Sequence, residues 1–174
     1  MATSSKQSQA AAGRMFPTRN DLPADTRRQL VALLNQHLAD YIDLYSQVKH
    51  AHWNVKGPDF IGLHKLLDEL AGLVEASIDE VAERATTLGG VAVGTTRAVA
   101  GATRLTEYPA DAHHTRAVAG VVADRFAEAG KATRAAIDAA DDLGDKDTAD
   151  LFTGVSRMLD KSTWLLEAHV QLEG

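Results

Sequence analysis

Four residues on one predicted helix have the types and spacing of metal ligands: His64, Asp68, Asp79 and Glu83. At 100° per residue they share one polar face of the helix, about 100° wide. Along the axis, however, the first two lie at least about 16 Å from the last two, at roughly 1.5 Å per residue. A metal ion with ligand bonds of about 2 Å cannot bridge that distance. Within one chain, this helix therefore carries two separate half-sites.

The two pairs of residues are nested around a common midpoint between Leu73 and Val74. An antiparallel two-fold contact between two copies of the helix, centred on that midpoint, places the first pair of one copy opposite the second pair of the other. His64 then faces Glu83 of the partner subunit, while Asp68 faces Asp79 of the partner subunit. The spacing predicts a site that is complete only in a dimer.

A further imidazole belongs to the same set. His52 lies on the apolar face of the preceding helix, just before the loop that leads to His64, so it can face the same corner. Two imidazoles and three carboxylates without a thiolate suit Fe²⁺ or Mn²⁺ and can accommodate Zn²⁺. Because carboxylates bridge two metal ions readily, a di-iron centre for oxidation chemistry is the predicted use of these ligands.

Each of these residues also has a simpler interpretation. His52 alone could be a hydrogen-bonded core histidine, and Asp79 and Glu83 could form a solvated strip, with Glu83 paired to Arg84 or Arg97. The combination of five ligand types is what favours a metal site. Acids on a stripe that we expect to be buried are costly without a partner.

Four long helices are predicted to position these side chains. Apolar residues recur at spacings of three and four, and Asp59 is a plausible N-cap for the second helix, which stops at Gly89-Gly90. The predicted spans are Pro23 to about Trp53, Phe60 to Leu88, Ala112 to Asp142 and Asp147 to Leu172.

Residues 90–110 form a long connection between the second and third helices, with a short helix expected around Arg97–Ala100. A connection of this length fits a crossover between opposite ends of a bundle. Bundles that hold two irons within one chain use Glu-x-x-His on two helices. This sequence has no Glu-x-x-His, which agrees with a site shared between chains. The predicted fold class is all-α, a four-helix bundle with one long crossover.

Composition limits the remaining possibilities. The 174 residues fit one domain, apolar residues make up 45% and aromatic residues only 5%, and cysteine is absent, so disulfides and thiolate sites are excluded. We find neither an apolar run near the ~20 residues that span a bilayer nor the apolar centre of a secretory signal, and we expect a cytoplasmic protein.

Charge is segregated along the chain. The net charge is −6, yet residues 1–20 contain Lys6, Arg14 and Arg19 and no acid, which leaves −9 on the remainder. We therefore predict a flexible basic N-terminal arm at residues 1–20 and a bundle domain at residues 21–174.

Several motifs together resemble the Dps family of mini-ferritins, in the ferritin-like superfamily. The resemblance covers about residues 20–172, and the His-Trp-Asn segment with its downstream acids is highly specific. The motifs are Lys49-His50-Ala51-His52-Trp53-Asn54-Val55-Lys56-Gly57-Pro58-Asp59-Phe60, Leu63-His64, Leu67-Asp68-Glu69-Leu70, Asp79-Glu80-Val81-Ala82-Glu83-Arg84, Asp147-Thr148-Ala149-Asp150-Leu151, Leu159-Asp160-Lys161 and Trp164.

The resemblance implies a hollow homododecamer with ferroxidase sites at its two-fold interfaces. It implies two Fe ions per site, held by His52, His64 and Asp68 of one subunit with Asp79 and Glu83 of its neighbour. Trp53 matches a tryptophan beside the site that can absorb oxidising equivalents, with a packing aromatic as the alternative. Acid-lined pores at the three-fold axes match Asp145 and Asp150, with a solvated helix start as the alternative.

The predicted function is that of a mini-ferritin. It oxidises Fe(II), preferentially with hydrogen peroxide, stores ferric oxide in the cage and so protects DNA. The N-terminal arm is expected to bind DNA without sequence preference through Lys6, Arg14 and Arg19, which would associate the protein with the nucleoid. Two alternatives remain: an iron-storage cage without DNA binding, and a structural cage with zinc in the metal site.

Overall fold

The structure, a computed structural model, describes residues 13–171, so Lys6 lies outside the described part of the chain. Helices account for almost all of its regular structure; the only β contact among the described residues is an isolated bridge between Lys56 and His114. The helices are α2 (Ala24–Asn54), α3 (Phe60–Thr87), α4 (Thr96–Ala100), α5 (Thr115–Asp142) and α6 (Lys146–Glu167).

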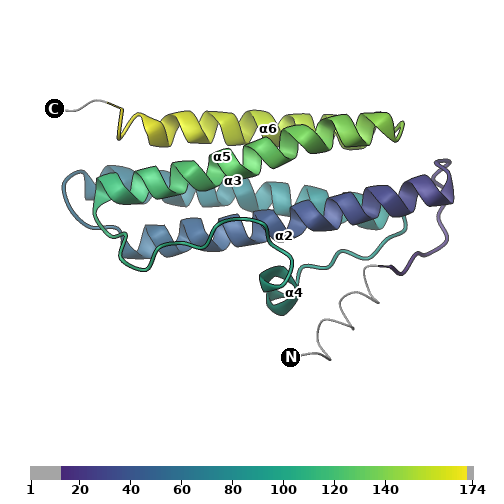
Figure 1. Cartoon of the computed structure of the whole chain (residues 1–174), viewed down its shortest axis with the longest axis horizontal. Helices are drawn as coiled ribbons and strands as arrows, with labels where there is room; N and C mark the ends of the chain where they lie inside the picture. The colour runs from purple at the N-terminus through teal and green to yellow at the C-terminus, as the bar shows by residue number, and fades with distance from the viewer. Residues whose placement is uncertain (1–12, 172–174) are drawn as a thin grey trace.

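The four long helices form two antiparallel pairs that pack on each other. Figure 1 shows α5 beside α6 above α2 and α3, with the crossover from α3 to α5 running along α2 and carrying α4. Leucine, valine and alanine side chains from all four helices fill the space between the pairs. The predicted all-α ferritin-like bundle with its crossover helix is confirmed. None of the helices described is long and apolar enough to cross a membrane.

Two helix boundaries differ from the expectation. α5 begins at Thr115 and not at Ala112, because the chain before it is extended and pairs with the α2–α3 loop: Lys56 N–H donates to the His113 carbonyl (2.8 Å) and Thr115 N–H donates to the Lys56 carbonyl (2.9 Å). α6 ends at Glu167, and residues 168–170 form turns.

The described part of the expected N-terminal arm contacts the end of α3. Phe16 N–H donates to the Gly89 carbonyl (2.6 Å), and Arg27 bonds the Leu88 carbonyl (3.0 Å) at the same place. Gly89 has a φ of +87°, and a Cβ there would lie 2.6 Å from the Phe16 carbonyl oxygen, so glycine is required. Phe16 and Thr18 therefore lie against the end of α3, and the arm's boundary at residue 20 stays a prediction.

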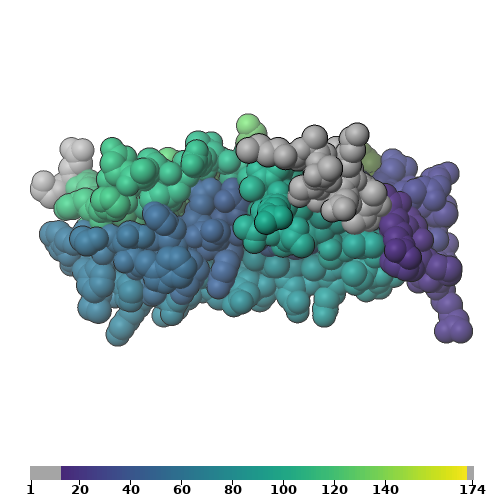
Figure 2. Space-filling view, turned by 90° about the horizontal axis from the view of Figure 1, so that it is seen from below, coloured from purple at the N-terminus to yellow at the C-terminus, as the bar shows by residue number. Residues whose placement is uncertain are grey.

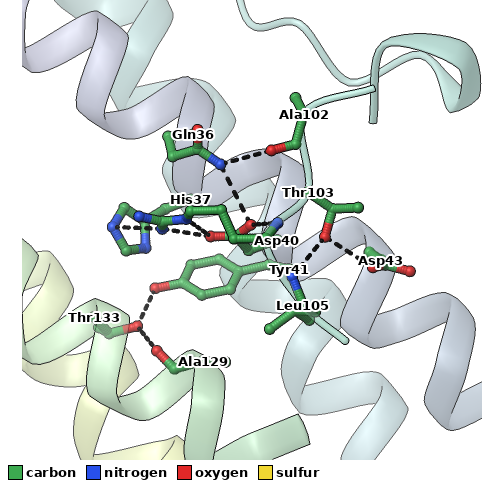
Figure 3. A network of polar contacts seen from close by, with 11 residues as sticks. Gln36, His37, Asp40, Tyr41, Asp43, Ala102, Thr103, Leu105, Ala129 and Thr133 are labelled. Carbon is green, nitrogen blue, oxygen red and sulfur yellow. Dashed lines mark hydrogen bonds and ion pairs between the residues drawn. The ribbon is translucent and has the colours of Figure 1, made fainter. Parts of the chain in front are cut away.

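The crossover is fixed to the middle of α2 by polar contacts (Figure 3). The buried carboxylate of Asp40 accepts bonds from the backbone N–H (2.9 Å) and the Nε (3.0 Å) of Arg104, and Asp43 accepts a bond from the Thr103 hydroxyl (2.8 Å). Next to Arg104, the side chain of His37 is buried against the ring of Phe152. Burial, with the nearby Arg104 guanidinium, lowers the pKa of His37 to about 4, so the imidazole is neutral at pH 7.

Candidate metal centre

Two histidines join the end of α2 to the start of α3 by reciprocal hydrogen bonds. Nδ1 of His52 bonds the backbone carbonyl of His64 (2.8 Å), and Nδ1 of His64 bonds the carbonyl of His52 (2.9 Å). The rings stack with centroids 3.8 Å apart. A carbonyl only accepts, so each Nδ1 carries a proton, and in the neutral imidazole the lone pair that can bind a metal is then on Nε2. Fixing a ligating imidazole through its second nitrogen is the usual arrangement at metal sites.

Asp68 extends this pair of imidazoles by one turn of α3. Its Oδ1 lies 3.9 Å from Nε2 of His52, a separation that one ion with two ligand bonds of about 2.1 Å can span. The same oxygen accepts a hydrogen bond from Nζ of Lys49 at 2.6 Å. That bond and the charge of Lys49 hold the pKa of Asp68 below its usual range, so the carboxylate is ionised.

The remaining two predicted ligands do not join this group within one chain. Asp79 and Glu83 are exposed in the C-terminal half of α3, while His52 and His64 lie at its other end. Among residues 13–171 no three histidine, aspartate or glutamate side chains are arranged to hold a metal ion. The chain thus presents His52, His64 and Asp68 together, and Asp79 with Glu83 separately.

The stripe that carries these ligands faces outward, contrary to the expectation that it is buried. Asp68 is 58% exposed, because the buried face of α3 is formed by other positions, such as Leu67, Leu70 and Val74. At the predicted two-fold midpoint, Leu73 leaves 48% of its surface in contact with solvent. In Figure 2, α2, α3 and the crossover form one continuous face of the molecule.

Trp53 follows His52 at the end of α2. It is 69% exposed, so within one chain it is not a packing aromatic of the core. The other histidines are not members of the predicted ligand set. His37 packs in the core, and the exposed histidines are His50, His113, His114 and His169.

The two aspartates expected at a pore have different surroundings. Asp145 is buried, caps α6 through Thr148 N–H (3.3 Å), and binds Nη2 of Arg84 with both oxygens at 2.8 Å. Burial alone would raise the pKa of Asp145, but the bonds from Thr148 and Arg84 and the Arg84 charge together hold it below its ordinary value. Arg84, one of the two arginines suggested as partners of Glu83, is thus paired with Asp145.

Asp150, in contrast, is exposed and lies in an open groove between α3 and α6. Two arginines, Arg84 and Arg157, line this groove with a larger number of acidic side chains: Glu80, Glu83, Asp147 and Asp150. The groove therefore connects the region of Asp150 with one of the predicted metal ligands. Asp145 is part of the helix-capping structure beside it.

Sequence reasoning did not single out Lys49 as a member of the site. A signal was present, because Lys49 precedes His52 by three residues on a helix and therefore shares its face. Only the fold shows that this face meets Asp68 of the next helix.

Comparison with known proteins gives a consistent result. The profile of the ferritin family, described as a ferritin-like domain, matches residues 31–173. The DNA protection during starvation protein of Agrobacterium fabrum is 45% identical over 154 residues, which are 88% of this chain and 95% of that protein.

Two solved structures extend the similarity to the fold. DpsC from Streptomyces coelicolor superposes with a TM-score of 0.87 at 32% identity, covering 93% of this chain and 94% of its own. The Dps protein from Vibrio cholerae O1, described as a member of a broad superfamily of ferritin-like diiron-carboxylate proteins, has a TM-score of 0.82 at 27% identity, with 89% and 97% coverage.

Proposed function

The chain is a member of the Dps family of ferritin-like proteins, and from this premise we propose that it is a ferroxidase that oxidises Fe(II) at sites shared between subunits. The observation that carries the proposal is the division of the ligands on α3. Two imidazoles with free Nε2 atoms and Asp68 lie at one end, and Asp79 and Glu83 lie at the other. A two-fold contact centred near the exposed Leu73 would combine them into two complete sites.

The proposed reaction uses two Fe(II) ions and hydrogen peroxide. Each ion gives one electron to the peroxide, the O–O bond breaks, and two protons complete two molecules of water. Because both electrons are delivered together, no hydroxyl radical is released. In this proposal Trp53, which follows His52 in the chain and is exposed, donates an electron if a stray oxidant forms at the site.

We further propose that the subunits assemble as a hollow homododecamer in the cytoplasm that stores the ferric product. Iron would reach the interior by acid-lined pores, where carboxylates concentrate cations. Asp150, exposed in the acidic groove, is the stronger candidate for that wall, since Asp145 is neutralised by Arg84.

Mixed cages test the shared site. A His52→Ala/His64→Ala subunit retains the acidic half-site, and an Asp79→Ala/Glu83→Ala subunit retains the histidine half-site. Each variant alone should be inactive, while random co-assembly should restore about a quarter of the sites, because a mixed dimer contains one intact and one doubly damaged site. Fe(II) oxidation by peroxide, followed by absorbance of the ferric product, measures the recovery.

The control is a mixture of the two variants purified separately and never co-assembled, which should stay inactive. Mixed cages that contain both chains and remain inactive would refute the shared site. Wild-type cages that bind zinc but do not oxidise iron would instead support the structural cage, and peroxide consumed at one molecule per two irons would support the pairing of electrons.

A second activity, DNA binding without sequence preference, is favoured by the charge distribution. The first 20 residues carry +3 on a body of −9, and the described arginines Arg14 and Arg19 are both exposed. The body should be repelled by phosphate, so only the arm can bind. Many arms on one cage would act together and multiply weak contacts. Binding would associate the protein with the nucleoid.

Replacing Lys6, Arg14 and Arg19 with alanine should abolish gel retardation of DNA, while assembly and iron oxidation persist. Wild-type retardation should weaken steeply with salt, because phosphate contacts release counterions. A Lys131→Ala/Lys161→Ala variant removes exposed charge from α5 and α6 and should behave as wild type. Equal retardation by the arm variant would refute the arm's role, and no retardation by wild type near 50 mM salt would remove the DNA function.

A further inference from the structure

Gly72 is an exposed glycine in the middle of α3 that contacts within the chain do not explain. Beyond the backbone of its own helix, a Cβ at Gly72 would meet no atom within 4 Å, whereas a Cβ at Gly90, just after that helix, would lie 2.4 Å from Val31. Glycine is less favourable than alanine inside a helix. Because a larger residue would fit the single chain and favour its helix, we look for the reason for this glycine outside the chain.

The position of Gly72 on α3 is the centre of the proposed two-fold contact. Gly72 and Glu75 are equally distant from the midpoint between Leu73 and Val74, as are the two members of each ligand pair. At 100° per residue, both lie about 30° from the centre line of the ligand stripe, on opposite sides. An antiparallel partner helix in this register places Glu75 of the partner subunit over Gly72.

The surface around this centre has the composition of a protein contact. Charged residues such as Asp68 and Asp79 are exposed on either side of it, but within residues 71–77 only one exposed residue is charged. The exposed residues of that segment are Gly72, Leu73, Glu75 and Ala76. An apolar centre with a polar rim is the usual anatomy of an interface between proteins.

We infer that Gly72 is the point at which the two α3 helices of a dimer approach each other most closely, with Glu75 of the partner subunit seated on the glycine. The distance between packed helices, about 8–10 Å, depends on the side chains between them. A side chain at position 72 would push the two helices apart and so lengthen the distance between the two halves of each metal site. Metal–ligand distances tolerate changes of only about 0.2 Å.

Gly72 is thus a positioning residue, which touches no metal ion but sets how far the imidazoles of one subunit lie from the carboxylates of the other. The inference rests on the proposed function, because only a site shared between subunits needs this distance. It adds to that function the contact that fixes the geometry of the site.

Gly72→Leu in the full-length protein tests the contact. The subunit should fold as in wild type by circular dichroism, because the chain leaves this position open. Its affinity for Co(II), measured by visible absorbance, should fall about tenfold or more, and Fe(II) oxidation by peroxide should fall with it. Gly120→Leu is the matched control, since a Cβ at this glycine of α5 also meets nothing within 4 Å, and it should leave both unchanged.

Removal of the opposing side chain should rescue the variant. Gly72→Leu/Glu75→Ala should recover most of the lost Co(II) affinity, because the leucine then occupies the space of the partner's glutamate. Gly72→Leu/Glu75→Gln keeps the size of that side chain without its charge and should not recover it. A role of Gly72 in the fold of the subunit alone would not distinguish these two double variants.

Disulfide formation tests the register independently of metal binding, because the chain contains no cysteine. Subunits with Gly72→Cys, co-assembled with subunits with Glu75→Cys and oxidised, should give dimers in which mass spectrometry identifies a link between positions 72 and 75. Such a link requires Cα atoms within about 7 Å of each other. Subunits with Gly120→Cys should form no link to those with Glu75→Cys.

The outcomes distinguish this inference from the function on which it rests. If Gly72→Leu binds Co(II) and oxidises iron as wild type does, the role of Gly72 is refuted and the shared site stands. A loss that Glu75→Ala does not rescue, without a link between positions 72 and 75, would refute the register. If subunits link at these positions but iron oxidation needs neither Asp79 nor Glu83, the shared site is refuted, and the positioning role of Gly72 with it.

Discussion

Asp68 and Asp145 are both aspartates with a cationic partner, yet their surroundings give them different roles. Asp145 is 4% exposed, caps α6 and binds Arg84 through both oxygens. Asp68 is 58% exposed and bonds Lys49 through one oxygen. An exposed carboxylate can exchange its partner for a metal ion at little cost, whereas a buried one cannot lose its partner without leaving an uncompensated charge.

Asp145→Asn should therefore lower the free energy of unfolding by about 2 kcal/mol, because Arg84 loses a buried carboxylate. The folded-state pKa of Asp145 lies below the ordinary 3.8, so its stabilising effect is present above pH 3.8 and is lost as pH falls through the folded pKa. The gap between wild type and variant should be constant from pH 7 to about pH 5 and then narrow.

Urea unfolding at one protein concentration, repeated from pH 7 to pH 3, measures this gap. Asp147→Asn is the matched control, because Asp147 is 84% exposed and lies 3.8 Å from the same arginine. It should change the free energy of unfolding by less than about 0.5 kcal/mol. A gap that widens in acid would contradict the assignment.

At the scale of elements, the crossover is the segment whose course depends most on specific polar contacts. It contains one short helix, α4, of which only Val99 is buried. Side chains of α2 bond its backbone: Gln36 donates to the Ala102 carbonyl (2.9 Å) and Gln47 to the Thr106 carbonyl (3.1 Å). Between these two points along the crossover, Arg104 binds the buried Asp40 through its Nε (3.0 Å).

Arg104→Met should loosen this segment. The Asp40 carboxylate, 1% exposed, would lose its charged partner, and we expect a loss of about 2 kcal/mol in the free energy of unfolding. Amides of residues 102–107 should exchange with deuterium faster, while those of α5 change little. Mass-spectrometric hydrogen exchange resolves the two segments.

Arg134→Met provides the comparison for Arg104. Arg134 and Asp160 form an ion pair in which both side chains are more than half exposed, so its loss should cost less than about 1 kcal/mol. Equal effects of the two substitutions would mean that the buried pair does not fix the crossover.

For the whole molecule, the distribution of charge and exposed apolar surface points to assembly. The outer face of α3 leaves Leu73 half exposed between its two groups of ligands and Ile61 exposed before the first group, and Glu83 lies at the edge of the acidic groove. In the proposed cage, the first surface is closed by a partner and the second remains open to cations. Because Glu83 belongs to both surfaces, the groove would lead cations toward the proposed site.

Asp150→Asn tests the supply route. It should slow Fe(II) oxidation several-fold at low iron and low ionic strength, because the acidic field that attracts cations is weakened. At saturating iron the oxidation rate should be as in wild type, since the ferroxidase ligands are intact. Stopped-flow absorbance at low and at saturating iron, each repeated at rising salt, measures both rates. Asp160→Asn, on the other half of α6, is the charge control. Unchanged rates with an intact cage would place the route elsewhere.

The sequence by itself determined the helices and the divided ligand set. Apolar spacing marked the four long helices, since a 3.6-residue period records which face is buried. The positions of four residues in the chain alone showed that a metal ion cannot be bound by all of them within one helix, because the rise per residue is fixed. These residues are His64, Asp68, Asp79 and Glu83. These are properties of local geometry, which a sequence carries directly.

Only the tertiary structure decided which partners these residues have. That Asp145 binds Arg84, that Lys49 reaches Asp68 and that Phe16 lies against Gly89 depend on contacts between segments far apart in the chain. The outward direction of the ligand stripe was decided in the same way, by how α3 turns against α2. Periodicity shows that a helix has two faces, but the packing of its neighbours determines which polar residues on those faces meet a partner.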